Sequence, residues 1–573
     1  MLTEHELMPE TAEHVASSHR RRTSICLVVT FLACAAVIVH SLLTDIPLNN
    51  SKETTYISSP LKSDGKQVDY FAAWEREVYP PEIATQANGF RLIVEHLGAA
   101  RNCTPAQFAE ICRKLGVDNP SSVPEIKFEG PRAFVDAHCA DLEDSFEEAR
   151  KRTSRLSAPW TLNDLPVMES WLVENGPAID LIGKAVGKPV FSIPLARTTE
   201  DESLFGSLVP EIYRVLSFVR ALETRANYRI GTGDLDGAID DIVACKRLGR
   251  HVGKDGNSIE MGLGRAFESV ADSIPIAGSL EHGPTDEQLS RLVKEFNELP
   301  AASQPQKANL FERYIALDAV QSLAHGKNTF AGIGVPEDAP RRGIDWNVVA
   351  RRINSHHDAA AKGVEMLPPT RNRSREFFSR KVRSELLGDM LGSLFCPSNE
   401  AFQEGSHRGT CRDRIHCLSL AMLRYESAHG TLPPAYTADA DGTPLHSWRV
   451  LLLPYLGQQM LHDKIRHDEP WNSPHNQKLH EESVAFYQCP SATLPLGQTT
   501  YAVVVGHEMP FEAAEAKKLA DIGDNNAAMI LIVERRSPVC WMDPTRDVLQ
   551  RVVLSLFFVN GPISRETSRK MTW

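Results

Sequence analysis

The residues best suited to binding a ligand lie in the C-terminal third of this 573-residue chain, in a loop rich in Pro, Asn and Asp. We call residues 468–476, which read Asp-Glu-Pro-Trp-Asn-Ser-Pro-His-Asn, the Trp471 loop. A tryptophan ring beside amide and imidazole groups is typical of a patch for a ligand or a protein partner. Asp and Asn side chains also bond nearby backbone groups, so a self-capped loop is the alternative. The candidate binding residues are Trp471, Asn472, His475 and Asn476.

Oxygen-bearing side chains also gather just before a predicted strand at 527–534. Calcium binds about 6 to 8 oxygen ligands, so a site here is one hypothesis. The spacing does not fit an EF-hand, and a turn that precedes the strand explains the same residues. Calcium is therefore the weaker interpretation. Its candidate ligands are Asp521, Asp524, Asn525 and Asn526.

The sequence shows no pattern of an enzyme or a zinc site. His462 and His467 are five residues apart, which is a poor spacing for two ligands on one helix. The chain contains no Gly-x-Ser-x-Gly, no Walker A loop and no His-Glu-x-x-His. We therefore expect a non-enzymatic protein without a metal or cofactor.

Composition limits the partners further. The net charge is −12, whereas general nucleic-acid binding needs clustered positive charge, so no nucleic-acid partner is expected. Nine of the eleven cysteines follow residue 44, and none of them forms a C-x-x-C pair. Most of these thiols are expected to be plain buried residues.

An apolar run near the N-terminus predicts a membrane anchor. Residues 24–43 carry no charge and span 20 residues, about 30 Å as a helix, which matches the bilayer core. Three arginines at 20–22 precede the run, so the positive-inside rule keeps a tail at 1–22 in the cytoplasm. A cleaved signal peptide is the competing interpretation, but no small-x-small site follows. We expect a single transmembrane helix at 23–44 in the inner membrane, with the bulk of the chain on the extracytoplasmic side.

The remaining chain divides by texture into three parts. Residues 45–69 are rich in Ser, Thr, Lys and Pro and predict a linker. Residues 70–375 show repeated amphipathic helical patterns and predict a large α-helical domain. One joint in it resembles a tetratricopeptide-type helical hairpin, although any antiparallel helix pair is an equal alternative. The small and apolar positions of this joint are Ala226, Gly231, Leu235 and Ala238.

Residues 376–573 predict an α+β domain. A helix over about 399–429 carries one apolar face. Short β-rich runs separated by Pro, Gly and Asn follow it, which favours a long helix packed on an antiparallel sheet. The helix face comprises Ile415, Leu418, Ala421, Met422 and Tyr425, and the runs are 485–489, 500–506, 527–534 and 551–559.

Several linked motifs in this region resemble one family, the pilin-like domain of unknown function fifteen-fifty-nine, also described as a family-ten solute-binding domain. The resemblance covers about residues 400–545, and the family is abundant in planctomycete-type bacteria. The motifs stand in the family's order, which makes the match specific. They are Cys411 to Tyr425, the His429-Gly-Thr-Leu-Pro-Pro helix stop, Asp439 to Leu456 with Ser447-Trp448-Arg449, the Trp471 loop, Tyr487-Gln-Cys-Pro-Ser, Asp521 to Asn526, and Val533-Glu534.

The resemblance implies an extracytoplasmic protein with a pilin-like fold. The prepilin leader of typical members is missing, and so is the family's closing histidine motif, which puts assembly into a fibre in doubt. We therefore expect a membrane-anchored interaction or scaffold protein of the cell envelope with envelope protein partners. The alternative is an extracytoplasmic solute- or sugar-binding protein that uses the Trp471 loop.

Overall fold

The computed structural model describes the larger part of the chain from residue 44 onward. Among the described residues, no helix has both the length and the apolar character needed to cross a membrane. The predicted transmembrane helix at 23–44 lies outside them, apart from Thr44. The described residues are 44–100, 103–118, 126–138, 154–200, 202, 204, 211–254, 257–275, 284–301, 305–326, 343–364, 379–396, 399–489, 492, 494–506, 509–518, 521 and 532–549.

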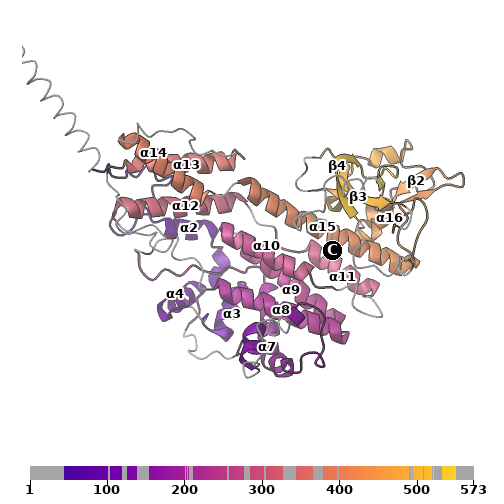
Figure 1. Ribbon diagram of the computed structural model, residues 1–573, viewed down its shortest axis with the longest axis horizontal. Helices are drawn as coiled ribbons and strands as arrows, with labels where there is room; N and C mark the ends of the chain where they lie inside the picture. The colour runs from indigo at the N-terminus through magenta and orange to yellow at the C-terminus, as the bar shows by residue number, and fades with distance from the viewer. Residues whose placement is uncertain are drawn as a thin grey trace, which may run out of the picture. The chain divides into compact units, whose positions relative to one another are not determined.

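The chain forms two compact units, each assembled from segments that are distant in sequence (Figure 1). The first unit comprises Met1–Val78, Thr199–Leu208 and Asn309–Asn399. The second comprises Tyr79–Thr198, Val209–Ala308 and Glu400–Trp573. The contiguous division at 375/376 drawn from sequence texture therefore differs from the division by compactness. The structure is multidomain and mostly helical, with small β-sheets near the C-terminus.

The first unit is helical. Aromatic side chains hold α2 against α12, with the Trp74 and Phe311 ring centroids 4.5 Å apart. Glycines on α14 allow it to approach α13 closely, because a Cβ at Gly392 would lie 2.5 Å from the His356 ring. The described helices of this unit are α2 (Tyr70–Val78), α13 (Trp346–Ala361), α14 (Arg380–Phe395) and most of α12 (Pro305–Ala324).

The segment 45–69 is folded onto these helices, which differs from the predicted linker. Asn354 Nδ2 donates to the Thr54 carbonyl at 3.0 Å, and Asn49 N–H donates to Asn347 Oδ1 at 2.8 Å. The Gln321 side chain accepts from and donates to the backbone of Val68. The segment has the polar composition of a linker, but hydrogen bonds between its backbone and side chains of distant helices hold it in place.

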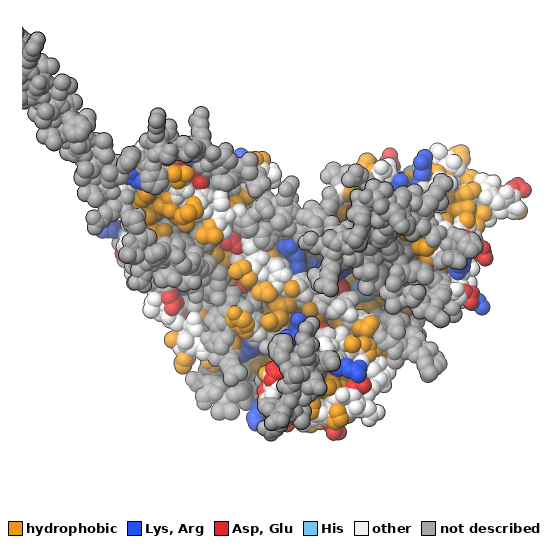
Figure 2. Space-filling view, viewed as in Figure 1, with side chains coloured by type: hydrophobic (Ala, Val, Ile, Leu, Met, Phe, Trp, Pro, Cys, Tyr) orange, Lys and Arg blue, Asp and Glu red, His pale blue; other side chains and the backbone are white. Residues whose placement is uncertain are grey.

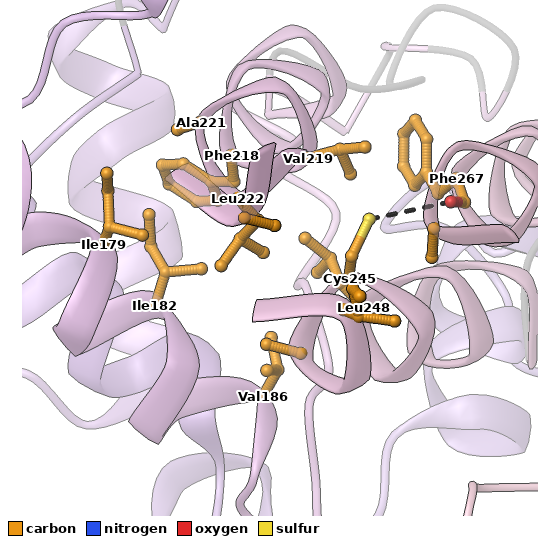
Figure 3. Packing of buried hydrophobic residues seen from close by; sticks show 14 of the residues in the cluster. Ile179, Ile182, Val186, Phe218, Val219, Ala221, Leu222, Cys245, Leu248 and Phe267 are labelled. Carbon is orange, nitrogen blue, oxygen red and sulfur yellow. Dashed lines mark hydrogen bonds between the residues drawn. The ribbon is translucent and has the colours of Figure 1, made fainter. Parts of the chain in front are cut away.

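Four helices form the centre of the second unit: α7 (Met168–Val186), α8 (Ile212–Thr232), α9 (Leu235–Lys254) and α10 (Ser258–Asp272). Ile182, Leu222 and Leu248 meet between α7, α8 and α9, and the Cys245 thiol donates to the Phe267 carbonyl at 3.6 Å (Figure 3). Helix α8 ends at Gly233, whose φ of 83° is the left-handed conformation that glycine accepts readily.

Close backbone contact joins α9 to α10. A Cβ at Gly249 would lie 2.6 Å from the Gly264 carbonyl oxygen, and a Cβ at Gly264 would lie 2.5 Å from the Gly249 oxygen. Only glycine permits this approach. Gly231, at the tetratricopeptide-like joint, makes a different close contact, because its Cβ would meet the Trp160 backbone oxygen at 2.2 Å. The repeat-like interpretation of this joint stays a prediction.

Short helices surround this layer. Three of the helices in this unit begin with capping boxes, in which Thr104, Asn257 and Thr285 each accept from a backbone N–H of the first turn. The short helices are η1 (Pro81–Ala84), α3 (Gly89–Leu97), α4 (Pro105–Leu115), α5 (Pro131–His138) and α11 (Asp286–Asn297).

The C-terminal part of this unit begins with the long helix α15 (Asn399–His429), which ends at Gly430 with a φ of 73°. Strands β1 (Tyr436–Ala438) and β2 (Pro444–Ser447) form a hairpin. Strand β3 (Gln498–Val505) pairs antiparallel with β4 (Ile532–Cys540), as expected, and parallel with β5 (Val548–Leu549). The short helical elements are α16 (Trp448–Leu452), η3 (Pro454–Leu456), α17 (Gln459–His462), η4 (Asn476–Leu479) and η5 (Ala485–Tyr487).

Two of the four predicted strands are not seen as strands in the described residues. The run 485–489 contains the 3-10 turn η5, in which the Ala485 carbonyl accepts from Gln488 N–H. The run 551–559 lies outside the described residues. The sheet is therefore small and mixed, and not a four-stranded antiparallel meander, over the part that the structure describes.

Helix α15 contributes residues to two hydrophobic cores of the second unit. Leu418, Ala421 and Met422 lie in the core of the C-terminal sheet region, with Ile415 and Tyr425 packed against it. These are the residues of the predicted apolar face. Cys417 and Leu420 on another face lie in the core of the α7–α11 helices. The predicted helix and its face are thus present, but the helix serves two cores.

Candidate functional site

Asn476 holds the Trp471 loop together from inside. Its side chain is fully buried. Its Oδ1 accepts from the Arg466 N–H at 3.0 Å, and its Nδ2 lies within hydrogen-bond distance of the carbonyls of Arg466, Glu469 and Pro470, at 3.0, 3.3 and 3.1 Å. Every polar atom of this side chain is used in the loop. Asn476 is therefore a structural residue, which agrees with the self-capped alternative for this position.

Trp471 stands at the surface of the same loop on a fixed support. Its ring stacks on His480, with centroids 5.0 Å apart and planes inclined by 19°. Its backbone N–H donates to the Leu445 carbonyl at 2.9 Å, and its own carbonyl lies 2.9 Å from His480 Nε2. The ring is half-buried, so part of it remains open to solvent. This arrangement presents an aromatic ring whose position is set before any partner binds.

The two other candidates lie in the same loop. Asn472 is exposed, and His475 is half-buried with Nε2 3.0 Å from the Lys464 carbonyl. The structure thus brings Trp471, Asn472 and His475 to the surface of one loop and places Asn476 beneath them. Sequence spacing could not separate these roles, because all four residue types occur both in binding patches and in capped loops.

Histidine rings pack next to this loop. The rings of His462 and His467 have centroids 4.3 Å apart, and His446 and His467 have centroids 5.4 Å apart. Burial lowers the pKa of both His446 and His462, which favours neutral rings. The His446–His467 pair meets edge-on and the His462–His467 pair is tilted, so these rings pack against one another.

The candidate calcium ligands lie largely outside the described residues. Asp521 is described as an exposed residue, whereas Asp524, Asn525 and Asn526 are not described. The calcium hypothesis therefore stays a prediction.

Ion pairs join α15 to the helical layer. Lys246 of α9 is fully buried and pairs with Asp272 of α10, at 2.6 Å, and with Asp413 of α15. Arg250 pairs with the same Asp413 and, at 2.8 Å, with Glu268. Burial acts to lower the pKa of Lys246, but the Asp413 and Asp272 carboxylates raise it above its ordinary value. These charges neutralise one another inside the unit, which makes them structural.

A group of sulfur and oxygen ligands escaped the sequence analysis. Cys411 of α15, Cys489 and Glu534 of β4 place one ligand atom each within 4.8 Å of the others. The Tyr501 hydroxyl donates to Cys411 Sγ at 3.1 Å. The residues are up to 123 positions apart in sequence, so no short motif could predict that they lie together. Burial and Glu534 act together with Cys489 to raise the pKa of the Cys411 thiol, the hydrogen bond with Cys489 being the largest cause.

Two motif residues of the C-terminal region have structural roles. Trp448 is fully buried, and its Nε1 donates to Asp547 at 3.2 Å. Asp439 accepts from the backbone of Asp441 and Thr443, and Gly442 has a φ of 81°, so a tight turn forms there. These residues shape the fold on which the Trp471 loop is mounted.

Comparison with known proteins places this region in context. No curated protein and no solved structure matches the chain. One family model matches, and its description is a protein of unknown function, DUF1559 (SBP_bac_10). It covers residues 401–530, which include most of α15, the Trp471 loop and β3. The C-terminal region of this chain is therefore similar to the DUF1559 family, as its linked motifs indicated.

Proposed function

We propose that this protein is a membrane-anchored, non-enzymatic interaction protein of the cell envelope. Its N-terminus lies in the cytoplasm, residues 23–44 cross the inner membrane, and the bulk of the chain is extracytoplasmic. Its DUF1559 region offers the Trp471 loop to a protein partner. The proposal combines the apolar run of the sequence, the family match and the geometry of the loop.

The single observation that carries the partner-binding role is the fixed Trp471 ring, which packs against the C-terminal core on one side and stays partly exposed. Tryptophan is enriched among the residues that dominate binding energy at protein interfaces, where a large ring is placed without much loss of side-chain entropy. Here the His480 stack and the Leu445 bond hold the ring in place beforehand. Asn472 and His475 supply polar groups at the surface of the same loop.

The described charges favour an interaction protein over a catalyst. The titratable groups around Lys246 are engaged with one another in the interior. On the face seen in Figure 2, basic and acidic side chains are interspersed among the described residues, without a patch of one sign. A partner would therefore be recognised by aromatic and polar contacts more than by net charge.

A cross-linking pull-down from membranes tests the proposal, with the full chain and Trp471→Ala compared. Tyr213→Ala is the matched control, because Tyr213 is an aromatic residue that is 65% exposed on α8. Loss of a central aromatic residue weakens binding by about 2 kcal/mol or more, roughly 30-fold. A partner recovered with the wild type and Tyr213→Ala but lost with Trp471→Ala is the expected result. Equal recovery with all three chains would refute the role of the loop.

Two further measurements separate the alternatives. A thermal-shift screen with sugars and other small solutes tests the solute-binding alternative, because a ligand that binds the folded state raises the melting temperature. Protease added to spheroplasts tests the topology: residues beyond 44 are expected to be digested while a tag on residues 1–22 is protected. A protected C-terminal region would contradict the extracytoplasmic location.

A further inference from the structure

Four side chains from distant parts of the chain converge beside the start of the C-terminal core. Cys411 lies on α15, Cys489 follows η5, and Tyr501 and Glu534 lie on neighbouring strands. Tyr501 and Glu534 are direct partners in the antiparallel register of β3 and β4. Directly paired residues of an antiparallel sheet project to the same face. The sheet therefore delivers a carboxylate and a hydroxyl to the side on which the two thiols stand.

We propose that Cys411, Cys489 and Glu534 bind one thiophilic divalent cation, Zn²⁺, through two thiolates and one carboxylate. We call these three residues the thiol site. Water fills the fourth position, because Glu534 is exposed and opens the site to solvent. The ion would tie the long helix to the sheet and to the segment that follows η5.

The distances agree with a site that closes slightly on the ion. In a tetrahedral zinc site with Zn–S of about 2.3 Å and Zn–O of about 2.0 Å, sulfur and oxygen ligands stand about 3.5 Å apart. The Cys411 Sγ to Glu534 Oε2 distance is 3.9 Å, and all three ligand atoms lie within 4.8 Å of one another. A closing of about 0.4 Å between Cys411 and Glu534, and of at most about 1.3 Å for the pairs with Cys489, brings the three ligand atoms onto one ion. Soft thiolate ligands select zinc over magnesium or calcium.

Neighbouring groups support the ligands as the outer partners of a metal site do. The Tyr501 hydroxyl donates to Cys411 Sγ at 3.1 Å, a bond that suits a thiolate acceptor. Arg414, one helical turn after Cys411, donates to the carbonyl of Gln488, the residue before Cys489. This bond fixes the segment that carries Cys489 against α15.

A simple disulfide between the two cysteines explains less of this geometry. A disulfide has no need of the Glu534 carboxylate within 3.9 Å of Cys411 or of the Tyr501 donor. Both are what a cation bound by thiolates requires. Binding releases two protons: two thiols lose their protons to water, both sulfurs bond the ion, and no electron is transferred. Zinc affinity is therefore expected to rise with pH.

The test uses the full chain, purified with reductant and stripped with a chelator. Co²⁺ is added as a spectroscopic substitute for zinc, and a thiolate-to-metal charge-transfer band in the near ultraviolet is expected at one ion per chain. Zinc affinity is then measured by competition with a chromogenic chelator. Cys411→Ser and Cys489→Ser remove a ligand and should lower the affinity by more than the roughly 10- to 100-fold typical of changes to outer partners.

Two variants keep the test independent of folding. Glu534→Gln changes an exposed carboxylate, so it should fold normally and still weaken zinc binding by at least about 10-fold. Cys540→Ser is the matched control on the same strand, half-buried like Cys411, and should bind zinc as the wild type does. Absence of the charge-transfer band in the reduced wild type would overturn the proposal, as would affinities equal to that of Cys540→Ser in all three ligand variants.

Peptide mapping without reductant distinguishes a Cys411–Cys489 disulfide from a bound metal ion. If the native chain is isolated with Cys411 and Cys489 resistant to alkylation and joined in one peptide pair, the residues form a disulfide and the metal site is refuted. If both thiols are alkylated only after the chelator is added, a bound metal protects them and the proposal is supported. Neither outcome depends on the partner-binding role of the Trp471 loop.

Discussion

Replacing Asn476 by Ala should destabilise the Trp471 loop, because Asn476 bonds the loop from inside. The accepted bond comes from Arg466 N–H at 3.0 Å, and two amide protons serve carbonyls at 3.0 and 3.1 Å, with a third at 3.3 Å. Three effective bonds contribute about 1 kcal/mol each, so a loss of about 3 kcal/mol is expected. Asn472→Ala, at an exposed position nearby, should change stability by less than about 0.5 kcal/mol.

The assay needs a local readout, because a chain of two compact units is not expected to unfold in one two-state step. Hydrogen exchange followed by mass spectrometry reports the opening of peptides that cover residues 464–480. In Asn476→Ala, these amides should exchange faster by a factor that corresponds to about 3 kcal/mol, roughly 100-fold. In urea unfolding of the same chains, the midpoint of the transition that includes this region should fall in Asn476→Ala.

Asn476→Asp gives the sharper second test. The carboxylate keeps the shape of the amide but places an oxygen where the NH2 group faces three carbonyl oxygens. It should destabilise the loop at least as much as alanine at neutral pH and less at low pH, once the carboxyl is protonated. If Asn476→Ala matches Asn472→Ala in exchange and in stability, the residue is not a structural support and the assignment is wrong.

Three other perturbations follow from the interior of each unit. Gly264→Ala should cost about 1–3 kcal/mol, since its Cβ would lie 2.5 Å from the Gly249 oxygen, whereas Gly262→Ala meets nothing within 4 Å and should be neutral or stabilise α10 by up to about 1 kcal/mol in urea unfolding. Lys246→Met removes the fully buried cation that Asp272 and Asp413 share, and the excess negative charge left between α9, α10 and α15 should cost about 3 kcal/mol in the same assay. Burial lowers the pKa of His357 to about 3, below its unfolded value of about 6.5. The neutral ring therefore stabilises the folded state above pH ~6.5, and about 2 kcal/mol of this stability is lost by pH ~5. The drop in melting temperature from pH ~6.5 to pH ~5 should be smaller in His357→Gln than in the wild type.

Helix α15 was predictable because its signal is local. Ile415, Leu418 and Met422 recur at helical spacing, and the glycine stop after His429 closes the pattern, so both the face and the end of the helix agree with the structure. Periodicity describes one face at a time. It gave no reason to expect that Cys417 and Leu420 pack in a second core, because that depends on where the α7–α11 helices lie.

The parts that could not be predicted depend on partners distant in sequence. Segment 45–69 has the composition of a linker, yet Asn354 and Gln321 bond its backbone from helices far along the chain. The thiol site has the same character, because α15, β4 and the segment after η5 meet only once the sheet is in place. Sequence patterns depend on residues that are close in sequence, so they predict neither the packing of segment 45–69 nor the thiol site.

The family match covers only residues 401–530, whereas the second compact unit also contains helices from Tyr79–Thr198 and Val209–Ala308. Helix α15 joins these two parts of the unit. The family model begins at residue 401, two residues after the start of α15. The match includes the β1–β2 hairpin and β3 but ends at residue 530, before β4. Leu418 and Met422 of α15 line the core of this region. In this chain the opposite face of α15 also carries Asp413 into the ion pairs of Lys246 and Arg250, which an isolated sheet region would leave unpaired. Because Cys417 and Leu420 of α15 also pack in the core of the α7–α11 helices, the region similar to DUF1559 is bound into the larger unit that contains α9 and α10. A partner held at the Trp471 loop, and an ion held at the thiol site, would therefore act on a framework that extends through the helical layer.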